Sequence, residues 1–301
     1  MAEFAAKLGY HIVCDKPLAI NATQARTMLS AVETAGVKHA YGTTSRYTAA
    51  SVHTHNLLAE SIIGNVQEIE SVAHLNMPAL LPYSWVFDLS QGGGMLNNLF
   101  THFLGQVLYM TDSEVLSVSG EARFLLDRAP VTEAIHDFRE LFQSKIDLAK
   151  IKEWHKVDSD TGYTVILQLQ MPRGQTVSAL FHGTGSLHPT PNYTAFHGTK
   201  GSLYLTGPNG PNRIQHSGGP GEEWQDIEIP KEISDALPQG DNHVQNGWNQ
   251  LFSEFVCDIR GEGYSGYPTF RDGWIASEII EIVLSNQSWT ALPKHPTNGD
   301  L

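Results

Sequence analysis

The segment from residue 92 to residue 102, GGGMLNNLFTH, places an amide and an imidazole four residues apart behind three glycines. In a helix, residues i and i+4 lie on the same face, so Asn98 and His102 are expected to point the same way. An unperturbed imidazole titrates near pH ~6.5, which suits proton transfer at neutral pH. The glycines let a backbone or a ligand approach without a clash with Cβ atoms. The pattern favours acid–base chemistry, although His102 as a core histidine and Asn98 as a capping amide remain alternatives.

A second candidate group follows the apolar run YHIVCDKP, which predicts a short buried strand that ends at Pro17. Lys16 therefore stands at the carboxyl end of a strand, where open α/β sheets place ligand contacts. A surface lysine is the alternative. Four further polar side chains could contact a hydroxylated ligand, two after the next predicted strand KHAYGTTS and two in the loop before the glycines: Arg46, Tyr47, Tyr83 and Asp88.

Two kinds of secondary-structure pattern follow one another along the chain. Near the N-terminus, helix-favouring segments at 2–8 and 22–35 alternate with the two short strands, and Asn21 and Gly36 are good cap residues for the second helix. A helix is expected over 47–63, and another begins near Gly94. Seven later segments read as strands separated by Gly, Pro and Asn, residues 206–222 read as a loop, and two amphipathic helices close the chain. The fold class predicted is α+β: a parallel layer of the Rossmann type, then a large, mainly antiparallel open sheet with helices on one face.

Composition excludes several classes of protein. Of the 301 residues, 41% are hydrophobic and 17% charged, which indicates a folded chain with a real core. The formal net charge of −13 argues against a nucleic acid or an anionic membrane as a partner. No apolar run is long enough for a membrane span, and the N-terminus lacks the features of a secretory signal, so a cytoplasmic location is expected. Cys14 and Cys257 both lie in apolar runs and are expected to be free thiols rather than a disulfide.

Other catalytic classes find little support in the sequence. His53 and His55 are two residues apart and would face different sides of a helix, so no metal site is expected. His182, after a strand, could line a pocket or close a hairpin. No G-x-S-x-G motif occurs, and no pattern indicates a cysteine nucleophile.

Four stretches together resemble the glucose–fructose oxidoreductase/inositol dehydrogenase/rhizopine catabolism (Gfo/Idh/MocA) family of nicotinamide-dependent sugar oxidoreductases. These stretches match the family's E-K-P motif, its G-G-G-x₄-D-x₃-H segment, its central sheet and its C-terminal helix, in the family's order: GYHIVCDKPLA, SWVFDLSQGGGMLNNLFTHFL, VDSDTGYTVILQLQMPRGQTVSALFHGTG and PTFRDGWIASEIIEIVLSNQSW. The resemblance implies a sugar, polyol or lactone as the small-molecule partner. It also implies NAD or NADP as the cofactor.

The resemblance also assigns roles to individual residues. His102 matches the family's general base toward the hydroxyl that is oxidised, and Asn98 stands where the family has an acid. An amide cannot support an imidazolium with charge, so His102 is expected to be a weaker base here. Asp15, Lys16 and Pro17 match E-K-P, whose lysine bridges the nicotinamide ribose and the substrate and helps to move the proton.

Family members begin with a dinucleotide-binding fold whose first turn carries G-x-G-x-x-G, and no such motif follows a strand in this sequence. We therefore expect residues 1–46 to be the C-terminal remnant of that fold, residues 47–301 to be the substrate and oligomerisation domain, and the chain by itself not to bind NAD(P). Three functions are left open: a truncated oxidoreductase of the family, a cofactor-independent hydrolase of a lactone or glycoside, and a non-catalytic sugar-binding or regulatory protein. The unpaired strand edge predicts association with a second copy. The resemblance also implies a homodimer or higher homo-oligomer, because family members commonly associate through the large sheet.

Overall fold

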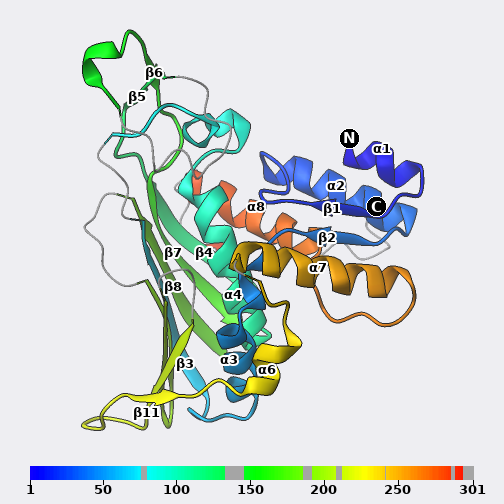
Figure 1. The fold of residues 1–301 in the computed structure, drawn as a ribbon, viewed down its shortest axis with the longest axis vertical. Coiled ribbons are helices and arrows are strands. Elements are labelled where there is room, and N and C mark those ends of the chain that lie inside the picture. Colours follow the sequence, from blue (N-terminus) through cyan, green and yellow to red (C-terminus); the bar gives the residue numbers. More distant parts are fainter. Residues whose placement is uncertain are drawn as a thin grey trace.

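A nine-stranded sheet forms the body of the protein in the computed structural model (Figure 1), which describes residues 1–75, 80–132, 146–185, 192–207, 212–240, 242–285 and 289–293. Its strands lie in the order β12-β11-β10-β9-β3-β8-β7-β4-β13. All neighbours are antiparallel except β3 and β8, which run parallel. The strands are β3 (Val66–His74), β4 (Glu114–Arg123), β7 (Gly162–Gln170), β8 (Thr176–Thr184), β9 (Tyr193–Gly198), β10 (Gly201–Thr206), β11 (Arg213–Ser217), β12 (Gln225–Ile227) and β13 (Thr290–Ala291).

Three helices cover one face of this sheet: α3 (Ala49–Ala59), α4 (Thr101–Thr111) and α8 (Phe270–Leu284) (Figure 1). The helices pack on this face because every second side chain along β7 and β8 is buried, mostly apolar and directed toward them. Phe100, Phe181 and Tyr163 meet edge to face at the centre of the resulting core. On the opposite face of the sheet no helix packs within the described residues.

A smaller layer projects from the helical side of the sheet. It contains α1 (Ala2–Lys7), β1 (Ile12–Cys14), α2 (Ala22–Ala35) and β2 (His39–Tyr41), with β1 and β2 paired in parallel. Asn21 caps α2 through a 2.9 Å hydrogen bond from the Gln24 amide, and Gly36 ends it in the left-handed conformation, as the sequence predicts. Phe270 and Trp274 of α8 belong to the core of this layer, so α8 ties the layer to the large sheet.

The fold class predicted from the sequence is confirmed, and three local expectations need correction or addition. Residues 213–217 form β11 inside the segment 206–222 that was expected to be a loop; an isoleucine, Ile214, is fully buried there and pairs with Leu205 of β10. The small antiparallel pair β5 (Arg128–Pro130) and β6 (Trp154–Lys156) was not expected, nor was the short helix α6 (Lys231–Ala236). Such short elements carry no periodic pattern of their own.

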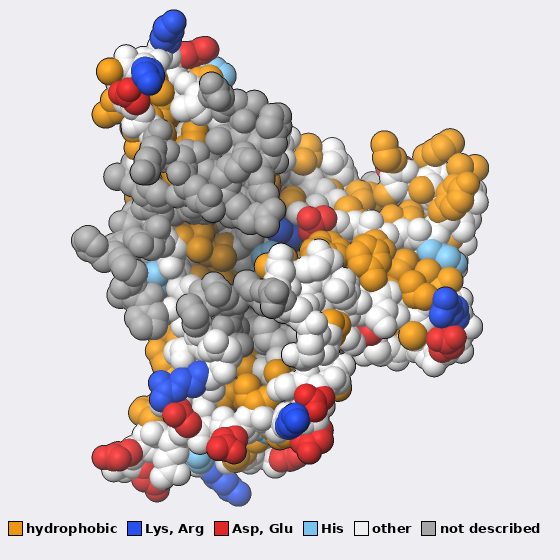
Figure 2. Space-filling view, viewed as in Figure 1, with side chains coloured by type: hydrophobic (Ala, Val, Ile, Leu, Met, Phe, Trp, Pro, Cys, Tyr) orange, Lys and Arg blue, Asp and Glu red, His pale blue; other side chains and the backbone are white. Residues whose placement is uncertain are grey.

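Helix α7 (His243–Ile259) buries only part of its apolar stripe. Leu251 and Phe255 are buried, whereas Phe252, Val256 and Ile259 are 46%, 38% and 38% exposed. Figure 2 shows this apolar surface continuing over the smaller layer. Periodicity identified the helix correctly, but the number of elements that pack against a stripe is decided by the rest of the fold.

Both cysteines are free, in line with the prediction from the sequence, and burial raises the pKa of the Cys14 thiol. Among the residues that the structure describes, no helix is both long and apolar enough to cross a bilayer.

Candidate active site

Each glycine of the 92–94 tripeptide permits a different close approach. A Cβ on Gly92, whose φ is +80°, would stand 3.1 Å from Pro17 Cγ. A Cβ on Gly93 would stand 2.5–2.7 Å from the carbonyl oxygens of residues 85, 86 and 88. On Gly94, at φ +100°, a Cβ would overlap the carboxylate of Asp160. The tripeptide is therefore a packing requirement of the turn, because a side chain at any of these positions would push neighbouring backbone or side chains away.

Residues 158–160, which precede β7, hold this turn in place through hydrogen bonds. The Asp158 carboxylate accepts a 2.8 Å hydrogen bond from the Leu89 amide, and the Ser159 hydroxyl donates to the Val86 carbonyl at 2.8 Å. Asp160 Oδ2 accepts from the Leu96 amide at 2.9 Å, at the start of the helical segment. Asp160 Oδ1 is buried without a partner, and burial raises the pKa of Asp160 to about 7. Asp160 was not among the residues predicted from the sequence; the signal for it was an acid in the turn directly before the buried strand β7.

The helix that follows begins with one π-helical turn, Leu96–Phe100, before α4. Asn98 lies in this turn, and its Nδ2 donates to the Gly94 carbonyl at 2.8 Å. That bond fixes the orientation of the amide and leaves Oδ1 available to accept a hydrogen bond from another residue. Wider turns of this kind are frequent at functional sites.

Lys16 reaches this amide from the end of β1. Its Nζ donates to Asn98 Oδ1 at 3.0 Å and lies 3.4 Å from the Asn98 carbonyl oxygen. Burial lowers the pKa of Lys16, while the nearby Asp15 charge opposes that shift. Asn98 supplies a dipole and not a negative charge, so the ammonium is held without a carboxylate at this contact.

His102 completes the cluster one turn beyond Asn98. Its Nδ1 is buried and has no hydrogen-bond partner. Burial of the ring, together with the Lys16 ammonium, lowers the pKa of His102 to about 3. The ring is therefore neutral at ordinary pH, and its role as a base stays a prediction.

Asp15 and Pro17 flank the lysine on the same turn. The Asp15 side chain accepts a 2.7 Å hydrogen bond from the Lys16 amide and is exposed, and the Lys16–Pro17 peptide is cis. Pro17 packs on Gly92, which brings the turn after β1 against the glycine turn. Their role toward a cofactor remains a prediction.

The other predicted site residues divide into two groups. Tyr83 and Asp88 belong to the loop that folds over Gly93; Tyr83 packs edge-on against His155, and Asp88 accepts three hydrogen bonds from Ser90 and Gln91. Arg46 lies with its guanidinium 4.0 Å from the ring centre of Tyr109, two helical turns along α4 from His102. The neighbouring Tyr47 donates to Glu254 at 2.7 Å. The structure thus joins Lys16, Asn98 and His102 and sets Arg46 and Tyr47 apart from them.

Lys16, at the end of the parallel strand β1, and His102 near it are the described residues that would hold the reactive end of a nicotinamide cofactor. The spacing G-x-G-x-x-G does occur at residues 261–266, but it follows the helix α7 and not a strand. A pyrophosphate cradle at a strand–helix turn is not found in the described part of the chain.

Comparison with known proteins identifies relatives of this chain. The model of the GFO/IDH/MocA C-terminal domain matches residues 52–204. Levoglucosan dehydrogenase from Pseudarthrobacter phenanthrenivorans is 26% identical, over 98% of this chain and 77% of its own length. Glucose-6-phosphate 3-dehydrogenase from Bacillus subtilis is 22% identical over 52% of this chain and 47% of its own.

Among solved structures, levoglucosan dehydrogenase in complex with NADH and L-sorbose superimposes with a TM-score of 0.78 at 19% identity, over 97% of this chain and 76% of that one. This likeness concerns the fold. Together with the family model, which spans half of the sequence, it supports a single assignment: the chain belongs to the Gfo/Idh/MocA family.

Proposed function

We propose that the protein is a sugar or polyol oxidoreductase in which Lys16 and His102 handle the substrate hydroxyl. The observation that carries this proposal is the contact of Lys16 Nζ with Asn98 Oδ1 beside His102, at the carboxyl end of β1. The relatives of the chain include two sugar dehydrogenases, and a levoglucosan dehydrogenase of the same fold has been solved with NADH and L-sorbose. A nicotinamide, when bound, takes up or supplies the hydride.

In this proposal the residues of the chain control the oxygen that reacts. The Lys16 ammonium donates to the substrate oxygen and stabilises the negative charge that develops on it. His102, which is neutral, accepts a hydrogen bond from the same hydroxyl and orients it. Asn98 holds Lys16 in place. The hydroxyl proton passes to Lys16 in its neutral amine form, which the lowered pKa makes more accessible, and the ammonium formed in this way is the group that donates to the substrate oxygen. His102, with a pKa of about 3, is the weaker acceptor for that proton.

Tyr83 and Asp88 stay candidates for contacts to other hydroxyls of the substrate, since their loop folds over the glycine turn. Arg46 and Tyr47 are less suited, because their side chains are engaged with Tyr109 and Glu254. That the chain alone does not retain NAD(P) also stays a prediction, so the assay supplies the cofactor in large excess.

The test measures reduction of NAD⁺ and of NADP⁺ with levoglucosan and a panel of monosaccharides and polyols, alongside cofactor binding by calorimetry. Activity that falls at least about 100-fold in Lys16→Met, but not in the exposed control Lys7→Met, supports the proposal. Turnover of a sugar lactone that survives removal of all cofactor and is lost in His102→Gln would instead favour the hydrolase. Stabilisation by a sugar with no turnover would favour a sugar-binding protein, and either result would overturn the oxidoreductase.

A further inference from the structure

A separate cavity of about 690 Å³ lies beyond the candidate active site. Its walls come from the C-terminal half of α4, the start of β4, the first turn of α8 and residues 291–293. Lys16, Asn98 and His102 do not line it. The volume lies in the range of about 300–1,000 Å³ that is typical of small-molecule sites.

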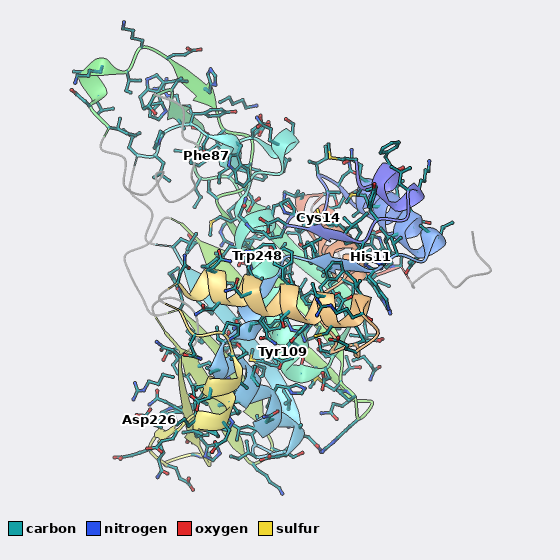
Figure 3. The ribbon with its side chains drawn as sticks, turned by 45° about the vertical axis from the view of Figure 1, so that its right-hand side comes forward. His11, Cys14, Phe87, Tyr109, Asp226 and Trp248 are labelled. Carbon is teal, nitrogen blue, oxygen red and sulfur yellow. The ribbon has the colours of Figure 1, made fainter. Side chains whose placement is uncertain are left out.

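Arg46 places a positively charged guanidinium at the wall of this cavity. The guanidinium lies over Tyr109, which Figure 3 labels on α4, at 4.0 Å from the ring centre. Arg46 Nε is buried and has no acceptor. Within the described ranges no carboxylate lies at ion-pair distance from Arg46, although seven other ion pairs are formed. A guanidinium at the wall of a cavity, with no carboxylate at ion-pair distance, favours a negatively charged ligand from outside the chain.

Among the described residues, three acids line the cavity: Asp112, Glu114 and Asp272. None of them forms an ion pair with Arg46, and two of the three have partners of their own. Asp112 Oδ2 pairs with His55 Nε2 at 2.8 Å. Asp272 Oδ2 accepts from the Thr269 amide at 2.7 Å and from its hydroxyl at 3.0 Å, in the capping box of α8. They therefore do not neutralise Arg46. Their charges do repel a dianion, so a singly charged group fits the cavity better than a phosphate.

The rest of the cavity lining is largely apolar and suits the uncharged part of an anionic ligand. Leu108, Val115, Ile275 and Leu292 line the cavity with apolar surface. Arg271, exposed on the first turn of α8, adds a second guanidinium at the rim, and the amino end of a helix favours a negative charge. A cation, a helix terminus and an apolar wall are the elements that an amphipathic anion needs.

We propose that this cavity is a second ligand site, which binds a small organic monocarboxylate. The carboxylate lies on the Arg46 guanidinium, which can donate two parallel hydrogen bonds, and the apolar body lies against Ile275 and Leu292. The proposal does not depend on which reaction the active site performs.

The test is calorimetric titration of the whole protein with benzoate, with benzamide as its neutral isostere and inorganic phosphate as a dianion. We expect benzoate to bind with a Kd of about 1 mM, and both other probes to bind at least about tenfold more weakly. Arg46→Met should weaken benzoate binding at least about tenfold. Arg213→Met is the matched control, because it removes an exposed arginine that pairs with Asp226 on β12.

A second variant keeps the test decisive if Arg46→Met folds poorly. Leu292→Glu leaves Arg46 on Tyr109 and places a competing carboxylate at the cavity wall, so it should also abolish benzoate binding. Equal binding of benzoate and benzamide, absence of benzoate binding to the wild type, or unchanged benzoate binding in both cavity variants would overturn the proposal.

Discussion

Replacement of Asn98 by Asp tests the electrostatics of the candidate active site most directly. It puts a carboxylate where Lys16 Nζ now meets an amide oxygen at 3.0 Å. Two unit charges at that distance attract by about 5.5 kcal/mol at an effective dielectric constant of ~20, which corresponds to about 4 pKa units. Solvent reaches part of the pair, so a rise of about 1–3 units in the pKa of Lys16 is the realistic expectation.

His102 should respond in the same direction and by less. Its pKa of about 3 reflects burial and the repulsion by Lys16, and a carboxylate at position 98 offsets that repulsion. We expect the pKa of His102 to rise by about 1–2 units. The variant also loses the Asn98 Nδ2 bond to the Gly94 carbonyl, at a cost of about 1 kcal/mol in the free energy of unfolding.

The assay is nitrogen-15 NMR of the histidine rings across a pH series in the folded protein, with the His102 resonances identified by their loss in His102→Gln. In the wild type the ring should stay neutral down to pH 5, whereas in Asn98→Asp part of it should carry a proton there. Asn56→Asp, an exposed change on α3, is the control for an added charge. Identical His102 titration in the wild type and Asn98→Asp would refute the reasoning, whatever the activity of either protein.

Four further outcomes follow from the structure. The pKa of His102 is lowered from 6.5 to about 3, so between those pH values the unfolded chain binds more protons than the folded protein. The free energy of unfolding of the wild type, measured by denaturant titration, should therefore fall by about 1–2 kcal/mol from pH 7 to pH 5. His102→Gln should show a smaller fall. The raised pKa of Asp160 has the opposite sign, since its ionisation destabilises the fold as the pH rises toward 7; Asp160→Asn should therefore gain about 1–3 kcal/mol at pH 8 and little at pH 4. Gly94→Ala, with a positive φ and the Asp160 carboxylate in its way, should lower the melting temperature by several degrees more than Gly174→Ala, which has a positive φ in open space. Light scattering should give the mass of a dimer or a larger oligomer. Ile166 lies on the helix-free face of the sheet and is 36% exposed, so Ile166→Asp should reduce the measured mass. A monomeric wild type would contradict the predicted oligomer.

The sequence was informative where the cause of a structure is local. Asn21 and Gly36 delimit α2 because a side-chain oxygen and a left-handed glycine act within one turn of their own position. Alternating apolar residues predicted β7 and β8 for a similar reason. The prediction of a loop at 206–222 was wrong because β11 forms by pairing with β10, and the composition of residues 213–217 does not reveal that partner.

The candidate site shows the same division. Residue types, their spacing and the family resemblance selected Asn98, His102 and Lys16 as candidates for the chemistry. Only the tertiary structure decided that Lys16 and Asn98, 82 positions apart, meet at 3.0 Å, that Asp160 lies beneath their turn, and that Arg46 faces a different cavity. Burial and long-range contacts set the pKa of a side chain and its neighbours, and both arise when distant segments pack together, which spacing along a chain does not specify.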